Sequence, residues 1–191
     1  MSAESPPMSS AAEAAAAGAG PLLTADPDRL WTAVQAKPRC EKRIAEWCGR
    51  LHLTHYLPLR KQVKRYQRRN VTTFIPLFRG YLFAQLSPEE RLQLGQFQKV
   101  ARIFPMDRER EAPLLAELRA VRIFELAGLA SALEIRPELA PGTPVTIAGG
   151  PLRGASGIVE RRQGKARITV NIELLGQSVT VEVAAAELET E

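Results

Sequence analysis

The sequence predicts an α+β protein of two domains, a split-βαβ sandwich followed by a small all-β barrel. Strand and helix patterns interleave from Trp31 to Leu126, then lapse around two prolines, and only short β-branched runs follow. With 45% of its 191 residues hydrophobic, the chain has enough apolar content for two small cores. The predicted divisions are a disordered tail at 1–28, the sandwich at 29–128, a linker at 129–141 and the barrel at 142–191.

The tail combines Ser, Pro, Gly and an Ala run, and it offers almost nothing to bury. No stretch of the chain approaches 18 apolar residues. The first residues also lack the basic and Leu-rich segments of a secretory signal. Two cysteines do not make a disulfide framework, which is typical of a reducing compartment. We therefore expect a cytoplasmic protein without a membrane span.

The sandwich begins with a strand at 31–36, where larger apolar residues alternate with smaller or polar ones. Apolar residues recur at helical spacing from Cys40 to Leu51 with cations opposite, which predicts an amphipathic helix. A second helix begins at Ser87, where a capping serine is followed by proline and, three residues on, by glutamate. The other predicted elements are strands around Tyr56-Leu57, at 71–75, 80–86 and 100–104, and a helix from about Pro113 to Leu126.

The barrel is predicted from strands at 144–148, 157–162, 167–172 and 178–183, which are separated by glycine turns. Isoleucine and valine alternate with polar residues in the last two strands, a pattern with poor helix propensity. Between the first two strands, glycines supply positive φ or close backbone approach in a tight loop. These loop glycines are Gly150, Gly154 and Gly157.

The positive charge of the chain is concentrated in its middle. Residues 29–140 carry 21 basic and 11 acidic side chains, whereas 1–28 carry four acids and no Lys or Arg. Residues 141–191 carry five basic and six acidic side chains. Six cations and no acid fall within 60–70, a stretch best explained as an exposed hairpin or loop. A solvated hairpin needs no ligand, but the local excess favours nucleic-acid contact here, through salt-dependent phosphate interactions.

No standard catalytic or metal-binding pattern occurs in the sequence, so we expect no enzyme, no cofactor and no metal. Cys40, Cys48, His52 and His55 form a cluster of ligating residue types, but their spacing matches no usual zinc site. The two cysteines lie two helical turns apart, roughly 12 Å, which is too far for a disulfide. Small apolar helix residues followed by a partly exposed histidine pair explain this cluster better.

The segment from Phe74 to Phe83 is rich in aromatic residues. On an alternating strand, Tyr81 and Phe83 share one face while Leu82 points to the other. One face must meet the helices, and the other could expose rings to a partner. Four of seven defined positions of an RNA-recognition motif also match, although no aromatic residue of the first strand supplies a second stacking platform.

Taken together, these residues resemble the NusG family of bacterial transcription elongation factors. The first half, with Trp31-Thr32-Ala33-Val34-Gln35-Ala36-Lys37-Pro38-Arg39 and Pro76-Leu77-Phe78-Arg79-Gly80-Tyr81-Leu82-Phe83, looks like the N-terminal (NGN) domain. The second half, from Pro141-Gly142-Thr143-Pro144-Val145 to 179–183, looks like the SH3-like KOW barrel. The wording of the aromatic motif is similar to specialised paralogues of the RfaH and LoaP kind rather than to a general factor.

The resemblance implies a monomer that binds the clamp helices of the RNA polymerase β′ subunit and suppresses pausing or termination. Its KOW domain would recruit a ribosomal protein or the termination factor Rho. The polymerase-binding residues would be Gln35, Pro76, Phe78, Arg79, Tyr81 and Phe83. The residues near upstream or non-template DNA would be Lys37, Arg39, Lys42, Arg43, Lys61, Lys64, Arg65, Arg68 and Arg69.

Arg79 departs from the family motif, which usually has proline at this position, and this affects the geometry at the clamp helices. We also predict that the C-terminal barrel keeps its β fold rather than refolding into helices. An alternative function stays open on the residues alone: an RNA-binding module that stacks bases on Tyr81 and Phe83 without polymerase.

Overall fold

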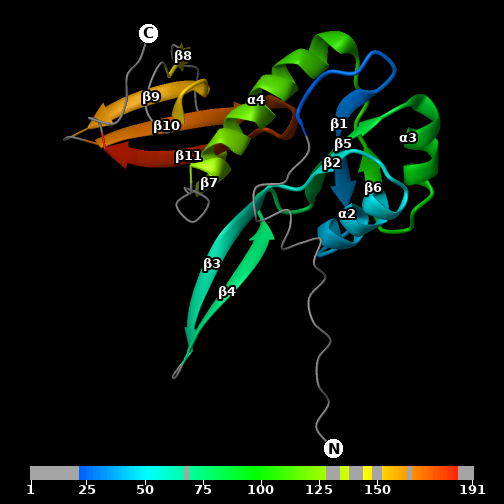
Figure 1. The fold of residues 1–191 in the computed structure, drawn as a ribbon, viewed down its shortest axis with the longest axis horizontal. Helices are drawn as coiled ribbons and strands as arrows, with labels where there is room; N and C mark the ends of the chain where they lie inside the picture. The colour runs from blue at the N-terminus through cyan, green and yellow to red at the C-terminus, as the bar shows by residue number, and fades with distance from the viewer. Residues whose placement is uncertain are drawn as a thin grey trace, which may run out of the picture.

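The computed structural model describes residues 22–66, 69–127, 134–137, 144–147, 152–162 and 165–184. Four strands form an antiparallel sheet in the order β2-β5-β1-β6 (Figure 1). They are β1 (Leu30–Ala36), β2 (His55–Tyr56), β5 (Tyr81–Leu86) and β6 (Val100–Ile103). One face of this sheet packs against α4 (Arg108–Leu126), and the other packs against α2 (Glu41–Arg50) and α3 (Pro88–Gly95).

Side-chain alternation along the strands gives each face its own core. On β5, Phe83 joins the cluster on the α4 side, whereas Leu82 and Ala84 join the cluster on the α2 and α3 side. On β1, Trp31 belongs to the α4 side and Val34 to the other. The predicted α+β class is thus confirmed for this part of the chain.

Capping residues set the helix starts. Ser87 and Glu90 form the predicted capping box, in which the Ser87 hydroxyl accepts from the Glu90 N–H and the Glu90 carboxylate accepts from the Ser87 N–H. The predicted start of the last helix near Pro113 is wrong, because the Asp107 side chain caps α4 by accepting from the Arg110 N–H. Pro113 therefore lies inside α4, in its second turn, where it leaves one carbonyl without its helical donor.

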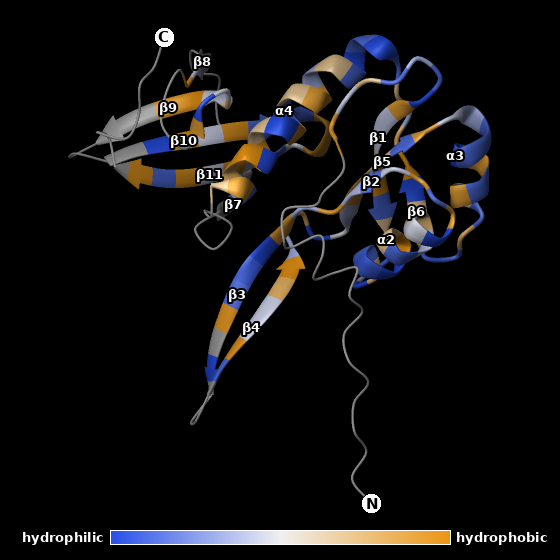
Figure 2. Cartoon of the chain, in the orientation of Figure 1, coloured by the Kyte–Doolittle hydropathy of each residue, from blue (hydrophilic) through white to orange (hydrophobic). Residues whose placement is uncertain are grey.

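A two-stranded hairpin, β3 (Leu59–Tyr66) and β4 (Arg69–Pro76), projects from the sheet as an arm (Figure 1). The basic run, predicted as an exposed hairpin or loop, therefore forms a hairpin. In Figure 2, β3 is mostly hydrophilic, while β4 is paler and becomes hydrophobic near its base. The arm therefore carries most of its cations on β3 and has little apolar surface with which to form a core of its own.

The C-terminal region forms a five-stranded antiparallel sheet in the order β7-β11-β10-β9-β8. Its strands are β7 (Glu134–Pro137), β8 (Pro144–Thr146), β9 (Ser156–Arg162), β10 (Lys165–Ile172) and β11 (Gln177–Ala184). A 3₁₀ turn, η3 (Glu173–Leu175), joins the last two. Four of these strands were predicted, and closure of the sheet into a barrel remains a prediction.

Two boundary predictions need correction. Strand β7 lies inside the predicted linker at 129–141, because it pairs with β11 along the edge of the sheet. The end of the predicted tail is ordered: the Arg119 side chain donates to the Leu23 carbonyl, and Leu23 itself is buried. The Trp31 indole and the Gln85 amide both donate to the Thr24 carbonyl. Residues 1–21 of that tail lie outside the described residues.

Candidate functional site

The aromatic segment lies on the α4 side of the sheet and is largely closed. Phe78 and Phe83 are both 0% exposed and meet edge to face, with ring centroids 5.9 Å apart. Tyr81 is half-buried, with its ring centroid 6.1 Å from that of Phe104. The open aromatic face expected from the sequence is not found, because the apolar side of α4 packs onto this face with Leu118 and Phe124.

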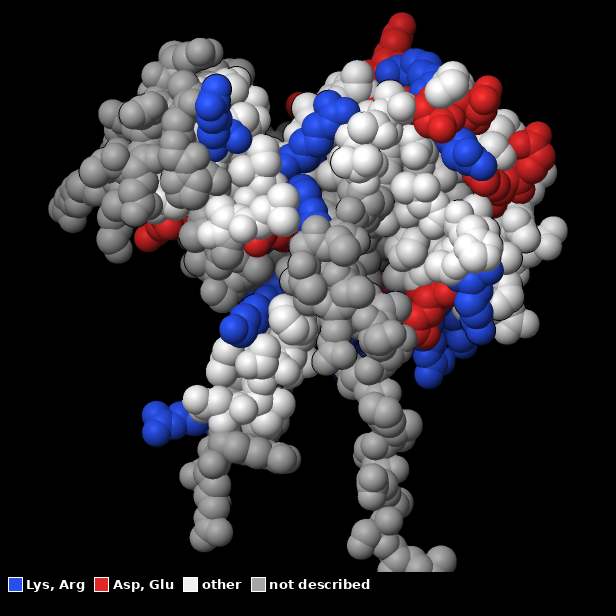
Figure 3. Space-filling model, in the orientation of Figure 1, with Lys and Arg blue, Asp and Glu red and all other residues white. Residues whose placement is uncertain are grey.

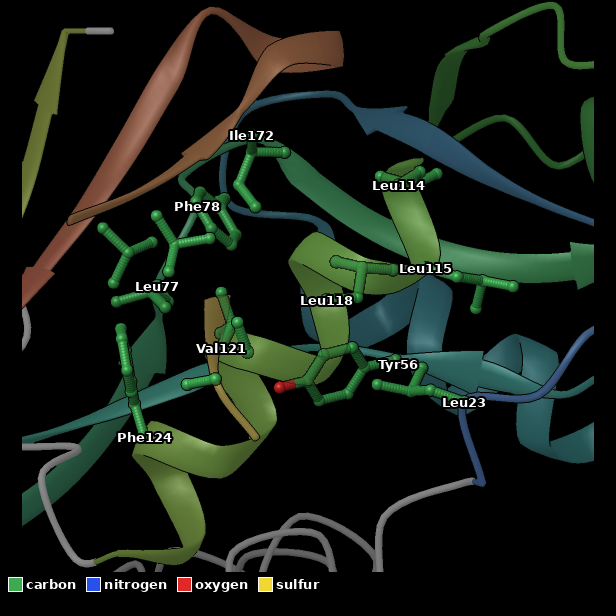
Figure 4. Close-up of a cluster of buried hydrophobic side chains, with 14 of the residues drawn as sticks. Leu23, Tyr56, Leu77, Phe78, Leu114, Leu115, Leu118, Val121, Phe124 and Ile172 are labelled. Atoms are coloured by element: carbon green, nitrogen blue, oxygen red, sulfur yellow. The ribbon is translucent and has the colours of Figure 1, made fainter. Parts of the chain in front are cut away.

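The C-terminal sheet contributes to the same buried cluster. Ile172, at the end of β10, belongs to one apolar cluster with Leu77, Phe78 and Val121, and Figure 4 shows these side chains together. At the edge of this contact, the backbone N–H of Glu173 donates to the Glu117 carboxylate at 3.3 Å. Phe78 therefore lies in a core shared by the first sheet, α4 and the C-terminal sheet.

Glu125 fastens the C-terminal end of α4 to the base of the hairpin. One of its oxygens accepts from the Tyr56 hydroxyl at 2.7 Å and the other accepts from the Leu59 N–H at 2.9 Å. Arg122 forms an ion pair with Glu125 at 3.1 Å. Burial, and then the nearby Glu125 carboxylate, raise the pKa of Tyr56 well above its ordinary value. The helix that closes the aromatic face is thus held by a polar network as well as by packing.

The remaining residues predicted to bind polymerase lie around this cluster. Gln35 pairs with Tyr81 between β1 and β5, and Pro76 pairs with Leu59 at the base of the hairpin. Both are half-buried, so they form an accessible rim beside the closed rings. Arg79 is separate from them: it is exposed in the turn before β5, at the end of the sheet.

Three loops meet at that end of the sheet and bring cations together. The Ala36 N–H donates to the Gly80 carbonyl at 2.8 Å, and the Lys37 N–H donates to the Lys99 carbonyl at 2.9 Å. The buried carboxylate of Glu41 accepts from the Gly80 N–H at 2.7 Å, which locks the turn that carries Arg79. We call the four cations of these loops the sheet-end cluster; they are Lys37, Arg39, Arg79 and Lys99.

Lys42 and Arg43, also predicted to lie near DNA, extend the sheet-end cluster onto the first turn of α2. Figure 3 shows Lys and Arg side chains gathered beside α2, next to acidic side chains. The sequence predicted Lys37, Arg39, Lys42 and Arg43 for this region but missed Lys99, whose position depends on the pairing of β6 with β1. The one feature of the sequence that could have indicated Lys99 is its position directly before a predicted strand.

Beside the sheet-end cluster, three side chains stack in a row. The rings of Trp47 and Phe97 are parallel within 2°, with centroids 4.7 Å apart. The Arg50 guanidinium lies over the Trp47 ring, 4.6 Å from its centroid. The indole nitrogen of Trp47 is buried and has no hydrogen-bond partner in the described part of the chain. Sequence reasoning placed Trp47 on the buried side of its helix and assigned no role to Phe97.

The hairpin carries the other predicted cations. Lys61 and Arg65 are exposed on β3, opposite Phe74 and Asn70 of β4. Arg68 and the side chains of Lys64 and Arg69 lie outside the described residues. The arm and the sheet-end cluster are thus two basic regions of the first domain, one projecting and one supported by the sheet.

In the C-terminal sheet, two of the three predicted loop glycines meet real conformational demands. Gly154 has a φ of +84°, which favours glycine. A Cβ on Gly157 would lie 2.6 Å from the Thr169 carbonyl oxygen on the neighbouring strand. Gly150 lies outside the described residues.

The described residues contain no group of three metal-ligating side chains and no helix both long and apolar enough to cross a membrane. Cys48 is buried, and burial raises the pKa of its thiol to about 12, so this cysteine stays protonated. Cys40 is partly exposed, and neither cysteine forms a disulfide.

Residues 29–122 match a protein-family model, NusG, described as transcription termination factor nusG. Among solved structures, one of the domain interaction in Thermotoga maritima NusG is 18% identical, with a TM-score of 0.42, covering 84% of this chain and 96% of that one. A MjSpt4:Spt5 complex is 17% identical, with a TM-score of 0.26, covering 85% of this chain and 98% of that one. Likenesses of this size carry no functional inference. No curated protein matches the sequence.

Proposed function

We propose that this chain is a transcription elongation factor of the NusG family that binds RNA polymerase, because residues 29–122 match the NusG family model. It acts by suppressing pausing or termination and catalyses no reaction. The observation that carries the proposal is the extent of the family match, which spans the whole four-stranded sheet with α2, α3 and most of α4. The mechanism is steric and electrostatic, since a polymerase whose clamp is held closed by a bound protein pauses less.

Polymerase binding is assigned to the α4 side of the sheet. The accessible rim of Gln35, Pro76 and Tyr81 would make the first contact with the clamp helices of the β′ subunit. Phe78 and Phe83 lie beneath this rim in the core shared with α4 and the C-terminal sheet, so they would reach the polymerase only after these covering elements move. The burial of Phe83 also counts against the alternative RNA-binding function, which needs both Tyr81 and Phe83 to stack on bases, because a ring with no exposed face cannot do so.

The C-terminal sheet is proposed to be a KOW barrel that recruits a second protein, a ribosomal protein or Rho. Its regular pairing from β7 to β8 and the demands on Gly154 and Gly157 are consistent with a compact barrel. The cations of the arm and of the sheet-end cluster are proposed to face upstream or non-template DNA. The similarity to specialised paralogues of the RfaH and LoaP kind remains part of this proposal.

The proposal is tested by titrating the full chain against bacterial core RNA polymerase. Tyr81→Ala should weaken binding at least about tenfold, since it removes a large ring from the accessible rim. Leu92→Ala is the matched control, because Leu92 is 72% exposed on α3, on the opposite side of the sheet. No binding by the wild-type chain, or equal losses in both variants, would contradict the proposal.

The covering of Phe78 can be tested in the same assay. Ile172→Asp places a charge in the shared apolar cluster and should release the C-terminal sheet from α4. We expect this variant to bind core polymerase more tightly than the wild type, because less work is then needed to uncover the face. An affinity equal to that of the wild type would show that the sheet does not obstruct the binding face.

A further inference from the structure

We propose that Arg102 is a specificity-determining residue of the polymerase-binding face, where it pairs with a carboxylate of RNA polymerase. This inference rests on the proposed function and deepens it, because it names the chemical group that the face recognises. Arg102 lies in β6, a strand to which the sequence analysis assigned no functional residue. The partner is a surface of the polymerase on which an aspartate or glutamate stands beside apolar side chains.

Strand pairing puts Arg102 in line with the accessible rim. Gln35 of β1 pairs with Tyr81 of β5 on one side and with Arg102 of β6 on the other. Residues that pair directly on neighbouring strands point to the same face of a sheet. Because Tyr81 packs against the cluster on the α4 side, the three side chains form a row across that face.

This row is the accessible part of the α4 side. The residues of β1 that join the buried cluster there are Trp31 and Ala33, which lie nearer the start of the strand. Gln35 and Tyr81 are only half-buried, and Arg102 is exposed. A protein that binds the rim therefore also meets the Arg102 guanidinium.

An aromatic ring supports the guanidinium of Arg102. The guanidinium lies over the ring of Phe104, 4.8 Å from its centroid, and the Phe104 ring in turn lies 6.1 Å from that of Tyr81. A guanidinium that rests on a ring keeps its N–H donors free at its edge. Those donors match the two oxygens of a carboxylate, so the arrangement suits an aspartate or glutamate.

The backbone that carries Phe104 is held at three points. The Phe104 N–H donates to the Ala33 carbonyl at 3.0 Å, and its carbonyl accepts from the Thr32 hydroxyl at 2.7 Å and from the Arg91 guanidinium at 3.0 Å. The support for Arg102 is therefore fixed before a partner arrives. A preorganised side chain loses less conformational freedom on binding, which favours a tight and selective contact.

The charge around the row favours an acidic partner. Within the described residues, no ion pair involves Arg102. The sheet-end cluster begins two residues after Gln35, at Lys37, and adds further positive charge beside the row. Phe104 and Met106 are half-buried and pack against the same apolar cluster, a surface that suits a protein side chain better than a hydrated phosphate chain.

The test is a titration of the full chain against core polymerase free of nucleic acid, in a salt series. We expect Arg102→Ala to weaken binding at least about tenfold and to flatten its salt dependence, and Arg102→Glu to weaken it at least about a hundredfold. Both variants should keep the thermal stability of the wild type, because the side chain is exposed.

Arg110→Glu is the matched control, since it makes the same change in net charge. The Arg110 side chain is 65% exposed, and the neighbouring Glu111 is bonded to the Trp31 N–H, at the other end of β1 from Gln35. This variant should change the affinity for core polymerase less than about threefold.

The stacked geometry is tested by two milder changes. Arg102→Lys keeps the charge but removes the guanidinium plane, and Phe104→Leu keeps an apolar side chain but removes the ring. Each should weaken binding about threefold, and the double variant should bind no more weakly than the weaker single variant, since both changes remove the same stack. Losses that multiply in the double variant would overturn the stacked arrangement.

The outcomes separate this inference from the proposed function. An affinity of Arg102→Glu within threefold of the wild type, or equal to that of Arg110→Glu, would overturn the inference while the wild type still binds polymerase. A loss seen only with an elongation complex that contains DNA and RNA would assign Arg102 to nucleic acid and overturn it too. Absence of binding by the wild type would contradict the proposed function, and the inference with it.

Discussion

Helices cover both faces of the four-stranded sheet, but only one of the two buried clusters extends into the C-terminal sheet. On one face, α2 and α3 cover Val34 and Leu82 of the sheet, Leu94 of α3 joins them, and this cluster stays within the first domain. On the other face, α4 covers Trp31 and Phe83, and its cluster continues into the C-terminal sheet. The first face is a self-contained core, whereas the second joins two parts of the chain. A substitution on the second face should therefore also change the stability of the C-terminal sheet.

The largest expected effect comes from Phe124→Ala on the α4 face. Phe124 is 0% exposed, and loss of its ring should lower the free energy of unfolding by about 3–5 kcal/mol. Because the cluster is shared, amide hydrogen exchange should speed up in β10 and β11 as well as in β1 and β5. Urea denaturation and hydrogen exchange measure the two effects.

Ile44→Ala on the opposite face is the matched comparison. Ile44 is also 0% exposed, and its truncation should cost about 2–5 kcal/mol. Cys48 lies in the same cluster, so in a Cys40→Ser background its rate of labelling by a thiol reagent should rise. Exchange in β10 and β11 should not change under conditions in which the first domain stays folded. Faster exchange there would contradict the difference between the faces.

A smaller effect is expected from Tyr56→Phe, which removes one donor from Glu125 and leaves the ring in place. The carboxylate keeps the Leu59 N–H and Arg122, so we expect a loss of about 1–2 kcal/mol in the free energy of unfolding at pH 7. The raised pKa of Tyr56 means that the folded state keeps a proton that the unfolded state releases near pH 10.

This proton difference gives Tyr56→Phe a second readout. The wild type should lose stability as the pH rises above about 10, while the variant should lose less, so the two curves approach each other at alkaline pH. Urea denaturation between pH 7 and pH 11 measures this. Parallel curves would show that burial and the Glu125 carboxylate do not raise the pKa of Tyr56 in the folded protein.

Local signals made much of this fold predictable. The capping box at Ser87 and the apolar spacing of α2 depend on residues within a few positions of each other, and both are realised. An exposed hairpin or loop was predicted from a run of cations with little apolar content. The start of α4 was predicted at Pro113 because proline favours the first turn of a helix, although Asp107 is the stronger capping residue.

The missing parts depend on contacts between distant residues. Phe83 alternates with Leu82 as expected, but nothing local shows that α4 and the C-terminal sheet would cover its face. Lys99 and Phe97 reach the candidate site only because β6 pairs with β1. Strand β7 ends in Pro137, a residue that indicated a linker in the sequence. The sheet accommodates this proline because β7 is an edge strand.

The smallest expected effect concerns Glu90, which lies at the start of α3. Because α3 covers the self-contained face of the sheet, a change at Glu90 tests how much a surface ion pair adds to the stability of that face. Hydrogen bonding to Arg29 lowers the pKa of Glu90, with Arg29 Nε and the carboxylate 2.9 Å apart. The ionised carboxylate therefore stabilises the fold above its ordinary pKa of about 4.5, and this contribution is lost as the pH falls through the lowered value. Glu90→Gln keeps an oxygen for the Ser87 N–H, so it removes the charge and leaves the capping geometry. Because exposed pairs are weak, we expect the Tm to fall by only about 1–2 °C at pH 7 and the two proteins to converge as the pH falls through the lowered pKa of Glu90. Thermal unfolding at acidic pH and at pH 7 measures this. A difference that persists once Glu90 is protonated would assign the effect to the hydrogen bond with Ser87 rather than to the charge.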